Sequence, residues 1–494
     1  MNRKQLCELL SLPDREGADF EVTGVTEDSR RARPGFVFAA LAGAHGDGHD
    51  HAAQAAAAGA AAVLGGREGL SGLHGLPYLY TPEPRRAAGL LAHALAGDPT
   101  RGMCVIGITG TNGKTSTAHL VQAVLDHTGA PCANFGTIAH RIGGETISAP
   151  HTTPFAEDLA ALFARAAAAG HRHAVMEVSS HALDQERTAG VEFSAAAFTN
   201  LTRDHLDYHG DMDRYRDAKL KLFRAVRPSG SAKWPRFTVV NAEDPAAPHF
   251  MAASGAPCHT YGAGAAYRAE KVRMDFGGTQ FRLVTPGGSA EARIRLIGGH
   301  NLSNALCAAA VCGGLGIAAG EVAEGLGTLD KVDGRFEPVD AGQPFYVIVD
   351  YAHTDDGLSN VLRAARALCR GRVITVFGCG GDRDKGKRPK MGAVAAQLSD
   401  FCVLTSDNPR TEDPHRILLD VEVGMQRAEK RKGDDYLVIE DRAEAIHRAV
   451  GLARPGDLVM IAGKGHENYQ IVGSERRHFD DRECALEALG GLKK

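Results

Sequence analysis

Apolar residues along the chain alternate between short continuous runs and longer stretches with helical spacing. Residues 105–108 form an apolar run typical of a buried strand, and from 115 to 127 the apolar positions recur with the period of a helix. The same alternation continues almost without a gap through the last part of the chain, with strand-like runs at 346–349, 373–377, 401–404, 436–439 and 458–461. Apolar strands that alternate with helices predict an α/β fold whose last domain is a mostly parallel, doubly wound sheet.

The first hundred residues alternate in the same way over shorter distances. Strands are predicted at 36–41, 62–64 and 78–80, and helices at 52–62 and 84–95. A chain of 494 residues is too long for one hydrophobic core, and its length favours roughly three domains. We place these domains at residues 1–100, 101–333 and 334–494.

A glycine-rich turn joins the apolar run at 105–108 to the helix that follows it. In such a turn, backbone N–H groups, the helix N-terminus and a lysine together suit a phosphate group. Thr115 can also hold Mg²⁺ through its hydroxyl. The strict P-loop pattern would have glycine where this chain has Ile108, and an ordinary glycine turn in a βα unit is the alternative. The residues of the predicted phosphate-binding loop are Gly110, Thr111, Asn112, Gly113, Lys114, Thr115 and Ser116.

Two polar segments downstream have the residue types of a divalent-ion site. Glu177 follows the strand-like run 174–176, where such folds place a partner of Mg²⁺. The Asp/His cluster at 204–209 has suitable ligand types but not the spacing of a zinc site. The alternatives are a surface glutamate and a polar surface loop. From the residues alone, Lys219 is a solvated lysine on a helix.

Four polar clusters follow the strand-like runs of the last domain, at 350–353, 378–388, 406–410 and 463–467. In doubly wound folds, ligands bind at the carboxyl ends of parallel strands, so these clusters are expected at one binding edge. Further upstream, Asn301 either caps the helix that begins near it or, with Asn304, faces a nucleotide.

Composition narrows the function classes. The chain is 44% hydrophobic and 23% charged, which is typical of a folded soluble protein, and its net charge of −4 argues against binding nucleic acid or membranes through a bulk positive field. The ten cysteines show no C-x-x-C pair, which favours buried thiols in a reducing compartment. Residues 55–64 are too short to span a membrane, and Glu8 and Asp14 interrupt any signal-peptide core. We therefore expect a cytoplasmic protein without a membrane span.

Taken in order, these motifs resemble the Mur ligases, the ATP-dependent amide-forming enzymes that build the peptidoglycan precursor. The resemblance covers nearly the whole chain and rests on the segments 110–115, 177–181, 199–210, 300–304, 333–335, 350–353 and 462–467. It is strongest to the members that add meso-diaminopimelate to UDP-N-acetylmuramoyl-L-alanyl-D-glutamate, whose Asp-Asn-Pro-Arg signature stands at residues 407–410.

The resemblance implies a UDP-sugar-binding first domain, a central P-loop ATPase domain and a C-terminal Rossmann-like domain for the amino acid. It implies that Lys219 is carbamylated by CO₂ and that Mg²⁺ is held by Thr115, Glu177, His205 and this carbamate. Catalytic roles fall to Lys114, Glu177, His205 and Lys219. ATP would contact the phosphate-binding loop together with Asn301, Asn304, Arg335 and Asp350.

The resemblance also assigns residues to the two other substrates. The UDP-sugar dipeptide would contact Glu27, Ser29, Ala44, His45, Gly46, Thr152, Thr153, Ser179, Gln185 and Arg187. Diaminopimelate would contact Arg383, Asp407, Asn408, Pro409, Arg410, Gly463 and Glu467. Two residues depart from the family pattern: His151 replaces an asparagine, and Asp355 replaces a proline at the start of a helix.

The implied reaction transfers the γ-phosphoryl group of ATP to a carboxylate, and an amine then attacks the acyl phosphate. It would serve peptidoglycan synthesis, and through it cell wall biogenesis, cell shape, cell division and the cell cycle, and we expect a monomer. The alternatives are a ligase of the same fold that adds another amino acid such as L-lysine or extends folate with glutamate, a P-loop ATPase that acts as a switch or motor, and a non-catalytic relative. Asp407 to Arg410 and the first domain argue against the other ligases, and Lys114, Glu177, His205 and Lys219 argue against the non-catalytic relative.

Overall fold

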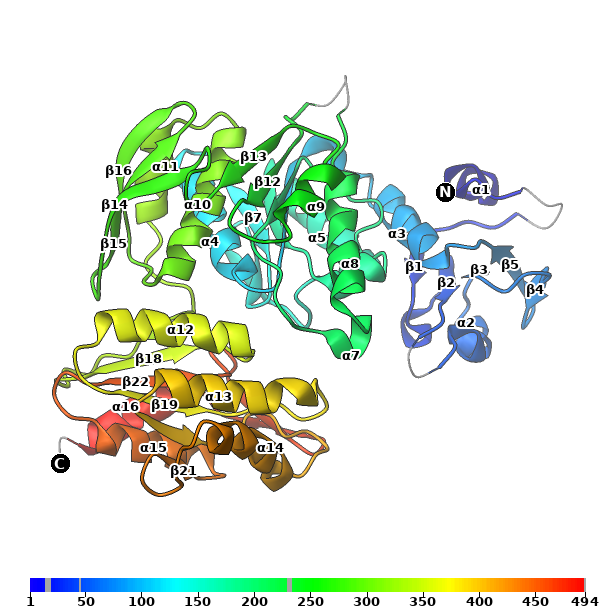
Figure 1. The fold of residues 1–494 in the computed structure, drawn as a ribbon. Coiled ribbons are helices and arrows are strands. Elements are labelled where there is room, and N and C mark those ends of the chain that lie inside the picture. Colours follow the sequence, from blue (N-terminus) through cyan, green and yellow to red (C-terminus); the bar gives the residue numbers. More distant parts are fainter. Residues whose placement is uncertain (14–18, 44–45, 229–232, 493–494) are drawn as a thin grey trace.

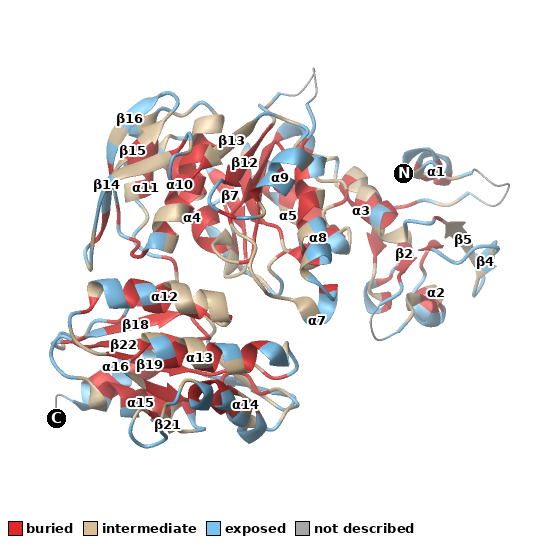
Figure 2. Cartoon of the chain, in the orientation of Figure 1, coloured by how far each residue is buried: buried red, intermediate tan, exposed pale blue. Residues whose placement is uncertain are grey.

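The computed structural model describes residues 1–13, 19–43, 46–228 and 233–492. Figure 1 shows three sheet-centred parts in chain order, with the central part between the N-terminal part and the C-terminal part. Buried residues are concentrated on the strands of the two larger sheets and on the helix faces that cover them (Figure 2). The predicted α/β class is therefore confirmed.

The first part is a small five-stranded sheet in the order β1-β2-β3-β5-β4, in which only β4 is antiparallel to its neighbour. Helices α1 and α3 pack on one side of it, and α2 packs on the other. The elements are α1 (Arg3–Leu10), β1 (Gly24–Thr26), η1 (Ser29–Arg31), β2 (Phe36–Ala40), η2 (Gly48–His51), α2 (Ala52–Ala57), β3 (Ala62–Gly65), β4 (Gly72–Leu73), β5 (Leu76–Tyr80) and α3 (Pro84–Leu95), followed by η3 (Pro99–Gly102).

The central part is an eight-stranded sheet in the order β13-β12-β11-β6-β10-β7-β8-β9. Six of its strands are parallel, and β8 and β9 are added as an antiparallel hairpin. Its strands are β6 (Cys104–Thr109), β7 (Cys132–Phe135), β8 (Ala139–Ile142), β9 (Glu145–Ser148), β10 (His173–Glu177), β11 (Ala195–Phe198), β12 (Phe237–Asn241) and β13 (Cys258–Tyr261). The helices between them are α4 (Lys114–His127), α5 (Ala156–Ala168), α6 (Ser180–Asp184), α7 (Leu206–His209), α8 (Met212–Ala225) and α9 (Ala247–Ala253).

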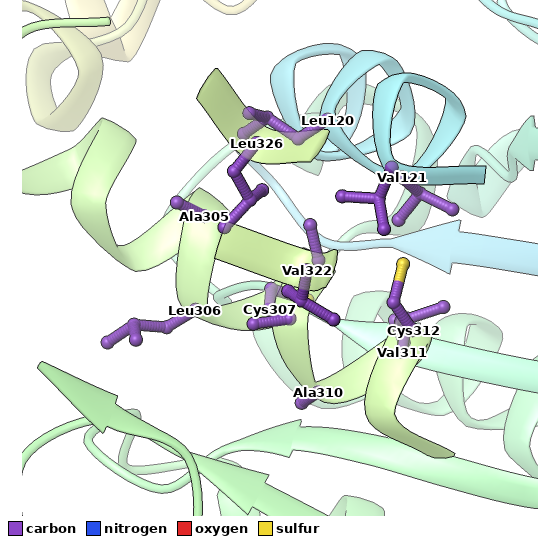
Figure 3. Packing of buried hydrophobic residues seen from close by; sticks show 14 of the residues in the cluster. Leu120, Val121, Ala305, Leu306, Cys307, Ala310, Val311, Cys312, Val322 and Leu326 are labelled. Atoms are coloured by element: carbon purple, nitrogen blue, oxygen red, sulfur yellow. The ribbon is translucent and has the colours of Figure 1, made fainter. Parts of the chain in front are cut away.

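An antiparallel three-stranded sheet and two helices complete the central part. The strands are β14 (Arg268–Asp275), β15 (Gly278–Thr285) and β16 (Gly288–Ile294), and the helices are α10 (Gly299–Gly314) and α11 (Ala319–Gly327). Figure 3 shows how Leu120 and Val121 of α4 meet apolar side chains of α10 and α11 in one buried cluster. This packing fixes α4, whose first turn belongs to the phosphate-binding loop.

The last part is a six-stranded sheet in the order β17-β18-β22-β19-β20-β21, parallel except for the short β17. Helices α12, α13 and α14 cover one face, and α15 and α16 cover the other. The strands are β17 (Glu337–Pro338), β18 (Tyr346–Asp350), β19 (Val373–Phe377), β20 (Phe401–Leu404), β21 (Tyr436–Val438) and β22 (Leu458–Ala462), with the separate hairpin β23 (Tyr469–Val472) and β24 (Glu475–His478). The helices are α12 (Asp355–Leu368), η4 (Lys385–Lys387), α13 (Arg388–Leu398), α14 (Pro414–Arg427), α15 (Arg442–Leu452) and α16 (Asp481–Gly491).

The element predictions hold closely, with informative exceptions. The helix predicted at 52–62 ends at Ala57, because a turn at Gly59 leads directly into β3. Asp355 stands at the first position of α12 and Thr354 caps the helix, so the departure from proline leaves the start of the helix intact. An acidic residue there favours the helix, since it faces the positive end of the helix dipole.

All ten cysteines are free thiols, and nine of them are buried, as their scattered positions predict. Across residues 1–13, 19–43, 46–228 and 233–492, no helix is long and apolar enough to cross a membrane.

Candidate active site

The phosphate-binding loop between β6 and α4 is held in place by the loop that follows the neighbouring strand β11. The Asn112 backbone N–H donates to Asn200 Oδ1 at 2.8 Å, and the Thr199 hydroxyl donates to the Asn112 carbonyl at 2.6 Å. Thr111 Oγ1 donates to the Thr202 carbonyl at 3.1 Å. The loop is therefore fixed by hydrogen bonds from the loop after β11, and its role in binding phosphate stays a prediction.

Two glycines of this loop cannot carry a side chain. Gly113 has φ = +84°, and a Cβ there would collide with Asn304 Oδ1. A Cβ on Gly110 would collide with the Thr199 hydroxyl oxygen. The backbone of the phosphate-binding loop thus lies so close to the loop after β11 and to the first turns of α10 that there is no room for a side chain at either glycine.

Two lysines converge on this loop. Lys114 Nζ donates to the carbonyls of Gly110 and Thr111, each at 2.8 Å, and Lys219 Nζ donates to the same Gly110 carbonyl at 2.8 Å. Lys219 is only 1% exposed, and its Nζ lies 4.4 Å from the centre of the Tyr215 ring. Burial, reinforced by Lys114, lowers the pKa of Lys219 well below its usual value. The interpretation of Lys219 as a solvated lysine is therefore wrong.

The Glu177 carboxylate lies directly beside the loop, as predicted for the acidic partner. Glu177 Oε2 accepts a hydrogen bond from Thr115 Oγ1 at 2.9 Å and another from Thr137 Oγ1 at 3.0 Å. The Thr137 backbone N–H donates to Glu177 Oε1 at 2.7 Å, and Arg335 Nη2 reaches Thr115 Oγ1 at 3.1 Å. A hydroxyl, a carboxylate and a guanidinium therefore meet at the first turn of α4.

His205 sits at the start of α7 with φ = +55°, an uncommon conformation for a residue with a side chain. Its Nε2 lies 3.3 Å from Asp204 Oδ2, and its ring contacts the His181 ring edge-on, with 4.8 Å between centroids. Burial lowers the pKa of His205 to about 3; Asp204 opposes this shift, while His181, Lys219 and Lys114 add to it. The imidazole is thus held neutral, which is the form that binds metals.

These residues fit Mg²⁺ better than a metal that needs an all-protein cage. In the part of the chain that the structure describes, no group of three or more His, Cys, Asp and Glu side chains could hold a metal ion. Mg²⁺ usually binds through one or two carboxylates together with substrate phosphates and water. The Thr115 hydroxyl and the Glu177 carboxylate, 2.9 Å apart, supply this kind of oxygen donor set.

A cavity of about 240 Å³ lies between α4, α10 and the start of the last part of the chain. It is lined by four of the predicted nucleotide contacts outside the loop, namely Asn301, Asn304, Arg335 and Asp350, and by Asn112, Gly113 and Ser116 of the loop itself. Asn200, His300, Tyr351, His353 and Asn360 also line it and were not among the predicted contacts.

The polar groups of this cavity fit an anionic nucleotide. Asn301 lies inside α10, where its Nδ2 donates to the Ile297 carbonyl at 2.8 Å, so it does not cap the helix. Arg335 stacks over the Tyr351 ring at 4.7 Å, and in the described residues its buried Nε has no hydrogen-bond partner. Asp350 accepts from the backbone N–H groups of Phe336 and Ala352, and burial raises its pKa to about 6.

A second cavity, of about 210 Å³, lies at the carboxyl ends of β19, β20 and β22. It brings together six of the seven residues predicted to contact diaminopimelate, namely Arg383, Asp407, Asn408, Arg410, Gly463 and Glu467. Pro409 lies in the same loop but does not line the cavity. The central part contributes Asp204, His205 and Asp207, so this cavity opens between the two parts of the chain.

The side chains of this second cavity are held by neighbouring loops. Arg410 Nη1 donates to the Gly381 carbonyl at 2.8 Å, and the Arg410 backbone N–H donates to the Ile471 carbonyl of β23. Burial by itself would raise the pKa of Asp407, but Lys464 and Arg442 lower it below its usual value. Arg442 is paired with Asp481 in a fully buried ion pair at 2.7 Å and also donates to the Ser406 and Ala462 carbonyls.

A third cavity, of about 610 Å³, lies against the first sheet and is lined by Glu27 and Ser29, by Arg30 and Arg31, and by Phe155. Burial raises the pKa of Glu27 despite the nearby Arg85 and Arg187. Near this cavity, the Gly46 carbonyl accepts a hydrogen bond from the Gly43 N–H. Ala44 and His45 lie outside the described residues.

The remaining predicted contacts of the UDP-sugar dipeptide are joined by hydrogen bonds next to Glu177. Thr153 Oγ1 donates to the Glu177 carbonyl at 2.8 Å and accepts from the Ser179 N–H, and Thr152 Oγ1 accepts from Thr137. Arg187 donates to the Thr153 carbonyl and to Gln185, and it stacks over Phe155. His151 packs edge-on against the same Phe155 ring, at 5.2 Å. These contacts connect the third cavity to the phosphate-binding loop.

Besides the contact of Arg335 with Thr115, further polar contacts join the central and last parts across the site. Asp356 of α12 accepts from Asn112 of the phosphate-binding loop at 2.8 Å and from Thr202 at 3.2 Å. Arg203 and Asp384 form an ion pair at 3.3 Å. Sequence reasoning did not identify Asp356, because an aspartate in a first helical turn is ordinary wherever it occurs.

The fold and the site define a P-loop enzyme of three α/β parts, in which a triphosphate seat faces a second, charged cavity. The chain belongs to the Mur ligase family. Residues 21–80 match the Mur ligase family catalytic domain, 108–312 the Mur ligase middle domain, and 334–465 the Mur ligase glutamate ligase domain. The predicted family and three-domain architecture are therefore confirmed.

Curated relatives match along the whole chain. The chain is 44% identical to the UDP-N-acetylmuramoyl-L-alanyl-D-glutamate–2,6-diaminopimelate ligase of Syntrophomonas wolfei, with 100% of both chains covered. It is 45% identical to the ligase of the same name from Bacillus licheniformis, with 99% of each covered. A solved structure of a ligase with this name superposes with a TM-score of 0.69 at 31% identity, covering 99% of both chains.

We predict that Gly113→Ala weakens ADP binding by roughly tenfold or more. A side chain at this positive φ costs about 1–2 kcal/mol of stability, and the loss of affinity comes from the new methyl group, whose collision with Asn304 forces a shift in the wall of the nucleotide cavity. Isothermal titration with ADP and Mg²⁺ measures the effect.

Gly129→Ala is the matched control for this variant. Gly129 has a similar φ of +74°, but a Cβ there meets no atom within 4 Å. It should therefore lower stability without changing nucleotide affinity, and equal affinities of the two variants would contradict the assigned role of Gly113.

Proposed function

We propose that the protein is an ATP-dependent ligase that joins 2,6-diaminopimelate to UDP-N-acetylmuramoyl-L-alanyl-D-glutamate and releases ADP and phosphate. The observation that carries this proposal is the second cavity, where His205, next to the triphosphate seat, meets Arg383, Asp407, Asn408, Arg410 and Glu467. The full-length relatives named for this reaction support it.

In this proposal, the substrates are divided among the three parts of the chain. Residues 1–100 hold the UDP-sugar through the cavity at Glu27 and Ser29, and 101–333 hold ATP and the dipeptide end. Residues 334–494 hold the amino acid. The separate sheet at the centre of each range supports these boundaries.

The first step moves the γ-phosphoryl group of ATP onto the free carboxylate of the glutamyl residue. Lys114 and the N–H groups of the loop neutralise the charge that spreads over the transferred group, and the loop geometry aligns the attacking and leaving oxygens. The oxygens of Thr115 and Glu177, together with His205, would hold Mg²⁺, which would supply further neutralisation of the phosphate charge. Arg335, beside Thr115, adds a cation on the same side.

The second step joins the amine to the activated carboxyl group. The ammonium of diaminopimelate first loses a proton to water, and its nitrogen then forms a bond to the acyl carbon. The bond from that carbon to the phosphate oxygen then breaks, the phosphate leaves with the electron pair and takes up the second proton of the nitrogen, and an amide remains. The cavity residues orient the amine for attack, and the contacts of Asp356 and Arg203 bring the two parts together, which helps exclude water from the acyl phosphate.

Specificity for diaminopimelate would come from its far end, which carries a carboxylate and an ammonium. Arg410 offers a guanidinium for the carboxylate, Arg383 offers another cation at the more exposed side, and Glu467 suits the ammonium. Lysine lacks the far carboxylate and would leave Arg410 with backbone carbonyls but no anionic partner from the substrate.

Lys219 suits carbamylation because its amine is buried and its pKa is lowered. Only the neutral amine reacts with CO₂: its nitrogen bonds to the carbon of CO₂, a proton is released, and the cation becomes an anionic oxygen donor. Such a donor beside Gly110 and near His205 would complete the oxygen ligands of Mg²⁺. Peptidoglycan synthesis in the cytoplasm, by a monomer that supports cell shape and division, is the setting that we propose for this chemistry.

The proposed reaction predicts that phosphate is released only when ATP, Mg²⁺, the UDP-sugar dipeptide and diaminopimelate are all present. A panel with diaminopimelate, L-lysine and L-glutamate, read by phosphate release and by product mass, measures this dependence. Activity with lysine alone would overturn the substrate assignment. Phosphate release without both acceptor substrates would favour a P-loop switch instead.

We predict that Arg410→Ala lowers kcat/KM for diaminopimelate roughly 30- to 1000-fold, because a carboxylate loses its charged partner in a half-buried cavity. This decrease corresponds to a loss of about 2–4 kcal/mol of transition-state stabilisation. The preference for diaminopimelate over lysine should narrow. Arg416→Ala, an exposed arginine on the nearby helix α14, serves as the control and should leave both values unchanged. Full activity of Arg410→Ala would refute this role of the guanidinium.

We predict a carbamate on Lys219, formed at pH 8 from ¹³C-bicarbonate and seen by ¹³C NMR as a resonance that Lys219→Ala lacks. Lys221→Ala is the control, because Lys221 lies on the same helix but is near Asp184 and Glu186 and is partly exposed. It should keep the resonance. A spectrum unchanged by Lys219→Ala would show that this lysine stays unmodified.

A further inference from the structure

Lys464 is a buried cation directly behind the amino-acid cavity. It follows β22 between Gly463 and Gly465, it is 0% exposed, and it is not among the residues that line the cavity. Its Nζ donates to Glu467 Oε2 at 2.9 Å and to Asn408 Oδ1 at 3.1 Å. Lys464 therefore touches two residues of the cavity wall without facing the cavity itself.

The same two residues also bond to each other. Asn408 Nδ2 donates to Glu467 Oε2 at 2.9 Å, and Asn408 Oδ1 accepts from the Ile471 backbone N–H as well as from Lys464. Glu467 Oε2 thus receives two donors, one from Lys464 behind the cavity and one from Asn408 in its wall. A carboxylate fixed in this way has one rotamer, and its remaining acceptor capacity has a set direction.

Lys464 also balances charge in the cavity wall. Asp407 and Glu467 are two carboxylates of one small cavity, and two like charges in one site disfavour each other. Lys464 is the first of the cations that lower the pKa of Asp407 against the effect of burial. Without it, burial would raise the pKa of Asp407 with less opposition, and the cavity wall would lose the cation that lies between its carboxylates.

We propose that Lys464 is a positioning residue that fixes Glu467 and Asn408, so that the cavity selects an amino acid with an ammonium group at its far end. This inference rests on the proposed function. It adds that Lys464 is the residue through which the enzyme comes to require the far amino group of diaminopimelate. Lys464 itself touches no substrate.

The test compares diaminopimelate with 2-aminopimelate, which has the same chain and both carboxylates but lacks the far amino group. The wild-type enzyme should prefer diaminopimelate strongly. In Lys464→Met, kcat/KM for diaminopimelate should fall by about 10- to 100-fold, mainly through KM, because a charge-assisted hydrogen bond is lost, and the preference over 2-aminopimelate should largely disappear. The KM values for ATP and the UDP-sugar dipeptide should stay the same.

A double-mutant cycle tests whether Lys464 acts through Glu467. The double variant Lys464→Met/Glu467→Gln should lose no more selectivity than Glu467→Gln alone. Lys464→Gln, which keeps one donor but no charge, is the milder variant and should fall between Lys464→Met and the wild type. Additive losses in the cycle would overturn the proposal.

Asp457→Asn is the structural control. Asp457 is a buried acid just before β22, at the opposite end of that strand, where it pairs with Arg372 at 2.7 Å. It should lower stability but leave the selectivity unchanged. If Lys464→Met behaved like Asp457→Asn, with lower stability and unaltered selectivity, Lys464 would be purely structural and the proposal would be overturned. If the wild type did not use diaminopimelate, the proposed function itself would fail.

Discussion

The active site depends on the hydrogen bonds between the phosphate-binding loop and the loop after β11. Thr199 and Asn200 bind the backbone of Asn112, and a side chain on Gly110 would displace Thr199. The positions of Lys114 and Lys219 follow from this contact, because both amines are anchored on the Gly110 carbonyl. A loop fixed from a neighbouring strand keeps its shape without a ligand, so binding does not have to organise it.

The second requirement is that the binding edges of two sheets face each other. Asp356 helps to meet this requirement, because its carboxylate accepts hydrogen bonds from Asn112 of the phosphate-binding loop and from Thr202 of the loop after β11. These two loops are also joined to each other by hydrogen bonds. The approach of the last part of the chain is thereby linked to the shape of the triphosphate seat. For a reaction through an acyl phosphate, this link is useful, since water enters a site that is only half assembled.

The sequence predicts those features that local pattern controls. The strand, turn and helix at 104–127 and the alternation after 346 follow from apolar period, and the cavity from Arg383 to Glu467 follows from the rule that ligands bind at strand ends. Pattern fails where burial depends on tertiary contacts. Lys219 has the neighbours of a solvated lysine in the sequence but is enclosed by Tyr215 and the phosphate-binding loop. In the antiparallel sheet β14–β16, only the central strand β15 is largely buried, and the outer strands β14 and β16 are mostly exposed or half-buried. Asn301 was ambiguous because a cap and a buried amide look alike in a sequence.

The chain carries a net charge of −4, yet three of its lysines are directed into or placed behind the site. Their partners differ, and the difference decides their chemistry. Lys464 contacts a carboxylate and an amide oxygen, so it serves as a fixed cation. Among the described residues, Lys219 contacts a carbonyl and an aromatic face and lies near a second lysine, so burial and that lysine lower its pKa although Asp204 opposes the shift. In a protein of slightly negative net charge, the neighbours of each buried lysine, rather than the overall field, therefore set its electrostatic role.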